Sequence, residues 1–194
     1  TTLAGFYEFV VARYNADGTL DVTFDGDGFF TLDVAGQFDS ANAVALQADG
    51  KIVVAGNVGE SSPTAYILRL NSDGTLDTSF DSDGVAAISN AGEPLSMAIQ
   101  SDGKVIFGST FFNGFTTSTI IVRLNTIGTL DTTFDGDGRL TVSPSLFRPS
   151  GLALQSDGKI VFAGQSSSSL TLHDVSLIRL NKNGTFDSTF DGDG

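Results

Sequence analysis

The chain has 194 residues and carries 23 acidic against 10 basic side chains, a formal net charge of −13. This balance argues against nucleic acid or an anionic membrane surface as a partner, and no apolar run reaches the length needed for membrane insertion. The absence of cysteine excludes disulfides, thiolate metal sites and a cysteine nucleophile.

The first element along the chain is a hairpin motif that occurs four times. It reads Arg-Tyr-Asn-Ala-Asp-Gly-Thr-Leu-Asp from Arg13 to Asp21, followed by Phe24 and an acidic loop. Further copies occupy 69–84, 123–138 and 179–194, and the spacings between successive arginines are 56, 54 and 56 residues. Asn-x-Asp-Gly is typical of a type I turn that ends in a left-handed glycine, and β-forming residues flank it. Each copy therefore predicts a β-hairpin.

A second hairpin motif, Gln-x-Asp-Gly-Lys, alternates with the first. It occupies 47–51, 100–104 and 155–159. Apolar runs flank the turn, as in 44–46 and 52–54, and no stretch shows helical periodicity. Two hairpins in each repeat give four strands, and a short further strand is expected after the acidic loop, as in 29–32.

These elements predict an all-β fold made of β-propeller blades of four antiparallel strands, in about three and a half repeats of about 55 residues. The chain is expected to be a single repeat domain, 1–194, with a half blade at 6–28 and blades at 41–84, 94–138 and 150–194. An open β-solenoid or array is the alternative. Three full blades are too few to close a ring of about four to eight, so the rest of a longer chain or self-association is expected to supply the remaining blades.

The turn type also predicts the pairing register of the first motif. With the turn glycine as a bulge, Tyr14 lies opposite Leu20 and Arg13 lies opposite Asp21. The later copies are expected to have the same register. A slip by one residue would place apolar side chains opposite aspartates. The arginine–aspartate pairs are therefore expected to act as cross-strand structural contacts.

Both motifs resemble the delta-60 repeat, a repeat of bacterial proteins that are often large and secreted. The matching stretches are the Gln-x-Asp-Gly-Lys hairpin, with its apolar tail ending near Gly56 and Gly164, and Arg-Leu-Asn-x-x-Gly-Thr-Leu-Asp-x-x-Phe. The resemblance covers nearly the whole chain and implies a propeller-like fold with an extracellular or cell-surface location. It brings no reaction and no catalytic residues. Ser109 and Ile127 depart from the pattern, at the tail glycine and the turn aspartate.

The loop after each Phe is the candidate metal site. Two aspartates one residue apart recur in it, as Asp25 and Asp27, Asp81 and Asp83, Asp135 and Asp137, and Asp191 and Asp193. Such carboxylates, together with backbone carbonyls, can converge on calcium, which prefers oxygen ligands. The alternative is that these aspartates and glycines serve only as turn residues. Calcium is the one candidate cofactor, and both alternatives stay open.

Loops that differ between repeats are candidate binding surfaces, at 57–64, 110–118 and 165–173. The middle loop carries Phe111, Phe112 and Phe115, which either form a contact surface for a protein or carbohydrate ligand or fold back onto the blade. The lone histidine, His173, and the serine-rich loop before it lack a catalytic context, and no phosphate-binding motif is present. No enzyme activity and no catalytic residue are expected.

The sequence thus favours a non-enzymatic extracellular repeat scaffold or binding module, stabilised by calcium if the acidic loops bind it, within a larger surface or secreted bacterial protein. Two alternatives remain. One is a structural subunit that self-assembles into a filament or matrix through its open blade edges. The other is part of a propeller-type polysaccharide hydrolase or lyase.

Overall fold

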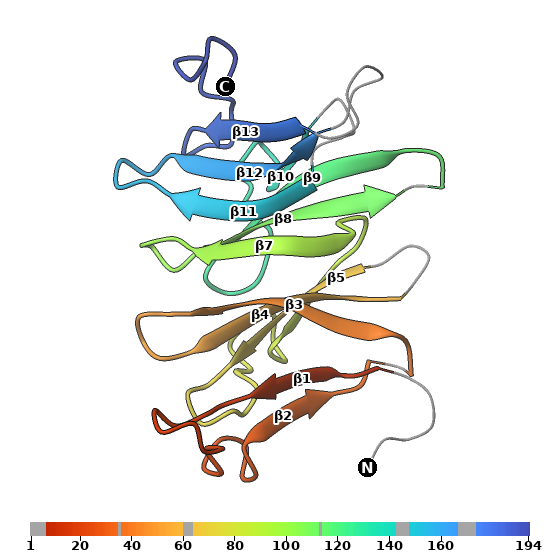
Figure 1. The fold of residues 1–194 in the computed structure, drawn as a ribbon, viewed down its shortest axis with the longest axis vertical. Coiled ribbons are helices and arrows are strands. Elements are labelled where there is room, and N and C mark those ends of the chain that lie inside the picture. Colours follow the sequence, from red (N-terminus) through yellow and green to blue (C-terminus); the bar gives the residue numbers. More distant parts are fainter. Residues whose placement is uncertain (1–6, 35, 60–63, 113, 143–147, 167–173) are drawn as a thin grey trace.

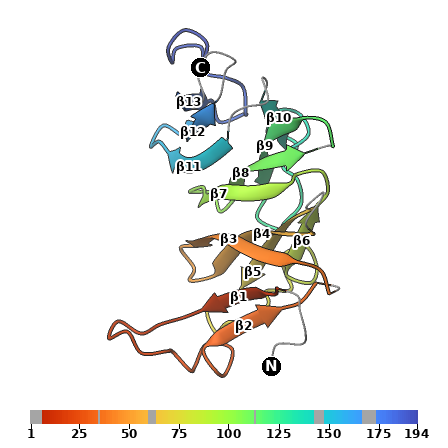
Figure 2. The ribbon, with the colours of Figure 1, turned by 45° about the vertical axis from the view of Figure 1, so that its right-hand side comes forward.

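Four antiparallel β-sheets follow one another along the molecule. The computed structural model describes residues 7–34, 36–59, 64–112, 114–142, 148–166 and 174–194, and within these ranges it has thirteen strands and no helix. None of the described segments is therefore a helix long and apolar enough to cross a membrane. Figure 1 shows the N-terminal strands at one end of the long axis and the C-terminal strands at the other, and Figure 2 shows the same order after rotation. The prediction of an all-β fold of antiparallel blades is confirmed.

Strands that are neighbours in sequence are neighbours in each sheet. The first sheet contains β1 (Phe9–Ala12) and β2 (Phe29–Leu32). The second contains β3 (Asp39–Leu46), β4 (Ile52–Val58), β5 (Thr64–Leu70) and β6 (Val85–Ile88). The third contains β7 (Glu93–Ile99), β8 (Val105–Phe112), β9 (Thr117–Leu124) and β10 (Arg139–Val142). The fourth contains β11 (Arg148–Leu154), β12 (Ile160–Ser166) and β13 (Asp174–Leu180).

The fourth strand of the second and third sheets lies elsewhere than predicted. We expected it directly after the Asn-x-Asp-Gly turn, but Leu76 forms only a single bridge with Leu70, and the fourth strand of the second sheet is β6. Asp77 explains the difference, because its Oδ1 accepts hydrogen bonds from the backbone N and the hydroxyl of Ser79 and turns the chain out of the sheet. The short strand after the acidic loop completes the blade, so the second sheet runs from 39 to 88.

The sheets pack face to face, and the hydrophobic core lies between them. Three clusters of buried side chains fill the three interfaces between successive sheets. In β4, Val53 and Ala55 face the third sheet, whereas Ile52 and Val54 face the first. This strand is buried on both faces, which explains its unbroken apolar run. Burial of Ile52, Val53 and Val54 contributes about 2 kcal/mol each to the free energy of unfolding.

Candidate functional site: a charged latch and the cleft beside it

The predicted register of the Asn-x-Asp-Gly hairpin is confirmed in all four copies. Tyr14 bridges Leu20, and the later copies pair Leu70 with Leu76, Leu124 with Leu130, and Leu180 with Phe186. The arginine Nε of each copy lies 2.6–2.7 Å from an aspartate Oδ2, in the pairs Arg13–Asp21, Arg69–Asp77, Arg123–Asp131 and Arg179–Asp187. The arginine–aspartate pairs therefore have the structural position that the sequence predicted.

A lysine and a phenylalanine join each pair in the second, third and fourth sheets. Lys51 Nζ lies 2.7 Å from Asp77 Oδ2, and the guanidinium carbon of Arg69 lies 4.7 Å from the ring centroid of Phe80. The equivalent lysines are Lys104 and Lys159, and the equivalent rings are Phe134 and Phe190. We call each set of arginine, aspartate, lysine and phenylalanine a latch. Sequence reasoning missed the lysine and the ring, although both recur at fixed places in the two motifs.

The latch also connects one repeat to the next. Arg69 Nη1 donates a hydrogen bond of 2.7 Å to the carbonyl of Thr126, which lies 57 residues further along in the turn of the next repeat. Arg13 and Arg123 donate in the same way to the carbonyls of Ser72 and Lys182. One guanidinium therefore ties a hairpin to its own aspartate and to the neighbouring blade.

The charged groups of the latch shift the pKa of its aspartate. Burial alone would raise the pKa of Asp77, but hydrogen bonds from Lys51, Ser79 and Arg69 outweigh it and hold this pKa well below its usual range. Asp131 has a lowered pKa for the same reasons, and in Asp187 the hydrogen bond from Lys159 is the largest cause. The latch aspartates are thus ionised at neutral pH and serve as ion-pair partners.

The aspartates of the candidate metal loops lie in turns. The first of each pair has a positive φ of 48–52°, in Asp25, Asp81, Asp135 and Asp191. The second accepts a backbone hydrogen bond in the first three loops, so that Asp27 Oδ1 receives the N–H of Phe29 at 2.9 Å. The described residues contain no group of three or more side chains arranged to hold a metal ion. Calcium binding by these loops stays a prediction, and the geometry favours the turn role.

The aromatic loop of the third sheet is divided between core and surface. Phe111 is partly buried and packs against the core between the second and third sheets. Phe112 and Phe115 are 47% and 93% exposed, so much of each of these two residues faces solvent. The other two variable loops include 60–63 and 167–173, and His173 with them, and these lie outside the described residues.

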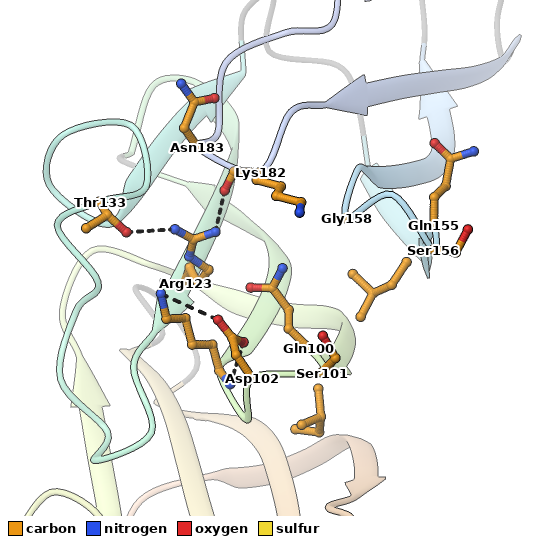
Figure 3. Close-up of a pocket in the computed structure, with 13 residues that line it drawn as sticks. Gln100, Ser101, Asp102, Arg123, Thr133, Gln155, Ser156, Gly158, Lys182 and Asn183 are labelled. Carbon is orange, nitrogen blue, oxygen red and sulfur yellow. Dashed lines mark hydrogen bonds and ion pairs between the residues drawn. The ribbon is translucent and has the colours of Figure 1, made fainter.

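A polar cleft of about 850 Å³ lies beside the latch of the third sheet. Figure 3 shows its two walls, the Gln-x-Asp-Gly-Lys turns at Gln100 and Gln155, with Arg123, Lys182 and Asn183 beyond them. The amides, hydroxyls and lysines of the lining suit a polar ligand. Gln100 Oε1 is buried and accepts no hydrogen bond within the described part of the chain, as is also true of Gln47 Oε1 in the preceding repeat.

A second cavity, of about 660 Å³, contains carboxyl groups. Glu8, Asp39 and Glu93 line it, and Asp39 is 3% exposed. Burial raises the pKa of Asp39, with smaller contributions from the charges of Asp33 and Glu8. Its Oδ2 accepts the N–H of Val34 at 2.7 Å, while Oδ1 has no partner among the described residues.

Antiparallel four-stranded sheets that repeat along the chain and pack face to face define a β-propeller repeat protein. A sequence model of one family, described as a domain of unknown function (DUF5122) beta-propeller, matches residues 1–24, 47–80, 100–134 and 155–190. These four segments cover more than half of the chain, and the chain belongs to this family. The matched segments contain the hairpin turns and the arginine-to-phenylalanine stretches that build the latches. A comparison with curated proteins found no match.

Proposed function

We propose that the chain is a non-enzymatic extracellular scaffold that displays binding surfaces for a protein or carbohydrate ligand, as a segment of a larger surface or secreted bacterial protein. One observation carries the proposal: the charged side chains common to the repeats pair with one another in the latches. What the fold leaves for a ligand is the polar cleft and the exposed rings of Phe112 and Phe115. The extracellular setting is supported by the resemblance to the delta-60 repeat.

Aromatic rings and free amide groups are typical of carbohydrate and protein contact surfaces. Phe112 and Phe115 lie at one end of the third sheet's strands, and the cleft lies by the turns at the other end. Calcium, if it stabilises this scaffold, would bind at the acidic loops. The two carboxylates of each loop favour such binding, whereas the hydrogen bond that the second aspartate already accepts within its turn disfavours it.

Binding to immobilised polysaccharides and extracellular-matrix proteins tests the proposal, with biolayer interferometry as the readout. A Phe112→Ser, Phe115→Ser double variant should lose binding to one of these ligands, and a Gln100→Ala variant should lose binding if the cleft is the site. Val175→Ser is the matched control, because Val175 is 86% exposed and lies in the fourth sheet. Binding that none of the site variants changes, or no binding at all, would count against the proposal.

The alternative of a polysaccharide hydrolase or lyase has one observation in its favour. Asp39 is a buried carboxyl group with a raised pKa that shares a cavity with Glu8 and Glu93, and such a group can act as a general acid. Release of reducing ends from a polysaccharide panel tests it. Turnover that disappears in Asp39→Asn while the fold is kept would establish an enzyme, and the absence of turnover in the unaltered chain would leave the scaffold proposal in place.

A further inference from the structure

The polar cleft lies at the junction of the third and fourth sheets, and the turn 181–184 that lines it differs in charge from its three counterparts. Its central residues are Lys182 and Asn183, where the other turns have Ala-Asp (15–18), Ser-Asp (71–74) and Thr-Ile (125–128). The net charge of these two residues is +1 in this turn, −1 in the first two turns and zero in the third. The turn itself does not require a cation, because neutral side chains occupy the place of Lys182 in the other repeats.

Lys182 differs from the other lysines in having no ion pair. The chain has four lysines, and Lys51, Lys104 and Lys159 each lie 2.7–2.9 Å from a latch aspartate. Lys182 forms no ion pair with any residue that the structure describes, including Asp157, which lines a smaller hollow with it. Its ammonium group therefore has no role in holding the blade.

The position of the Lys182 side chain is fixed by its neighbours. An added Cβ at Gly158 would stand 2.0 Å from Cε and 3.0 Å from Cγ of Lys182, so the methylene groups of the lysine lie across this glycine. Its backbone carbonyl accepts the hydrogen bond from Arg123. Figure 3 shows the side chain reaching from its turn into the space between Arg123 and the turn at Gly158. Contacts of both the backbone and the methylene groups thus direct the ammonium group into the cleft.

The other charges of the cleft are paired with one another. Lys104 Nζ lies 2.9 Å from Asp131 and 3.6 Å from Asp102. Arg123 Nε lies 2.7 Å from Asp131. Two aspartates thus offset one lysine and one arginine, and the charge of Lys182 remains. The cleft therefore has one net positive charge, although the chain as a whole has a net charge of −13.

Neutral polar groups surround this cation. The cleft is lined by the amides of Gln100, Gln155 and Asn183 and by the hydroxyls of Ser101 and Ser156. At the preceding junction, Gln47 Nε2 donates a hydrogen bond of 3.4 Å to the carbonyl of Gly103. The amide nitrogen of Gln100 makes no equivalent bond within the described ranges, so the two turns beside the cleft are not joined in this way. Several amides and hydroxyls around one cation match a ligand that has many hydroxyl groups and a single negative charge in each unit.

We propose that the cleft binds an acidic carbohydrate, with the carboxylate of a uronic acid unit at Lys182 and the sugar hydroxyls at the surrounding amides. The ammonium group would donate a charge-assisted hydrogen bond to the carboxylate. The cleft volume of about 850 Å³ is typical of small-molecule sites. A polymer of higher charge density, such as a sulfated one, would be repelled by the net charge of −13. This inference rests on the proposed binding function and names the class of ligand for the cleft.

Isothermal titration calorimetry of the whole chain tests the proposal, in EDTA so that no calcium joins the ligand to the acidic loops. The probes are short oligomers of galacturonate, glucuronate and mannuronate, each compared with its uncharged methyl ester. At least one acid should bind with a Kd below about 1 mM, and its ester should bind about tenfold more weakly or worse. A polyglutamate peptide, which has carboxylates without sugar hydroxyls, should bind more weakly than that acid.

Two variants address Lys182. Lys182→Met removes the ammonium group and should raise the Kd of the acid by about tenfold or more. Arg148→Met is its matched control, because Arg148 is an exposed cation at the start of β11, whereas the turn that lines the cleft follows the other end of this strand. Gly158→Asn keeps the positive φ of 84° and places a Cβ where the lysine lies, so it should also weaken binding of the acid. Its control is Gly50→Asn, whose Cβ would lie 3.7 Å from the nearest atom of Ser72.

Thermal unfolding without ligand confirms that each variant folds. Acids that bind no better than their esters or than polyglutamate would overturn the inference. So would equal effects of Lys182→Met and Arg148→Met, because they would indicate a general attraction between charges. If a neutral polysaccharide or a protein binds the chain and none of the three acids does, the inference fails and the proposed function stands. If no ligand of any kind binds, both fail.

Discussion

Lys51 Nζ lies 2.7 Å from Asp77 Oδ2 and thereby joins the turn between β3 and β4 to the hairpin that follows β5. The two residues are 26 positions apart, and Asp77 is only 6% exposed. The same contact recurs between Lys159 and Asp187. In each of these sheets, the lysine joins the Gln-x-Asp-Gly-Lys turn to the Asn-x-Asp-Gly hairpin.

Replacement of Lys51 should remove its charged hydrogen bond to Asp77. We expect Lys51→Met to lower the free energy of unfolding by about 2 kcal/mol, because Asp77 remains buried with one partner fewer. Urea unfolding measures the change. Lys182→Met is the control, since Lys182 is exposed and forms no ion pair in the described part of the chain, and its effect should stay within about 0.5 kcal/mol. Equal effects of the two substitutions would contradict the role given to Lys51.

A side chain at Gly74, the turn glycine that lies against the Phe24 ring of the preceding repeat, should disturb the contact between two sheets. We expect Gly74→Asn to lower the free energy of unfolding by about 2 kcal/mol, because its Cβ would clash with the Asp25 nitrogen while asparagine still allows the positive φ. Urea unfolding of Gly18→Asn in dilute solution provides the comparison, since that turn has no neighbour. A Gly74 variant as stable as the Gly18 variant would show that the contact of Gly74 with Phe24 and Asp25 is not tightly packed.

The hairpin turns, their register and the arginine–aspartate pairs could be predicted because they depend on neighbours within about ten residues. Asn15, Gly18 and Leu20 suffice to place Arg13 opposite Asp21. The contact of Lys51 with Asp77 could not be derived this way, since it requires the relative placement of two hairpins. The fourth strand was misplaced because Asp77 was treated as a strand residue, although its side chain bonds locally to Ser79.

The site was less predictable than the fold. Arg69 reaches Thr126 across a blade interface, and no local pattern reveals which carbonyl of the next repeat it meets. Phe111 and Phe112 are adjacent in one strand and therefore point to opposite faces, so only one of them packs against the core. The predicted aromatic surface thus reduces to Phe112 and Phe115.

Acid should weaken the latches in a defined pH range. The pKa of Asp77 is lower in the folded chain than the value of about 3.9 expected in the unfolded chain, so the ionised form stabilises the fold above that pH. As the pH falls below about 4 and through the lower folded pKa, this contribution should disappear. Denaturant unfolding of the unaltered chain and of Asp77→Asn checks it. The variant should be less stable at pH 7, and the difference should shrink in acid; a difference that stays constant down to about pH 2 would contradict the pKa shift.

Metal removal separates the two roles of the acidic loops. Because Asp27 and its counterparts already accept backbone hydrogen bonds, we expect thermal unfolding curves in excess EDTA and in millimolar calcium to coincide, with magnesium as the control. A calcium-specific rise in Tm would instead show that the loops bind the ion, since a ligand at a hundredfold excess over its Kd adds about 2.7 kcal/mol. A parallel variant, Asp137→Asn, would then identify the loop of the third sheet.

The repeated charged residues of the latches hold the blades together. Urea unfolding of Arg69→Ala tests it most directly, because Arg69 is 6% exposed and binds Asp77, Ser79 and the carbonyl of Thr126 in the next blade. We predict a loss of about 3 kcal/mol, the size expected when one partner of a buried ion pair is removed. The exposed Arg148 provides the control, and Arg148→Ala should cost less than about 0.5 kcal/mol. An Arg69→Ala chain that unfolds at the same urea concentration as the unaltered chain would contradict the structural role of the latch.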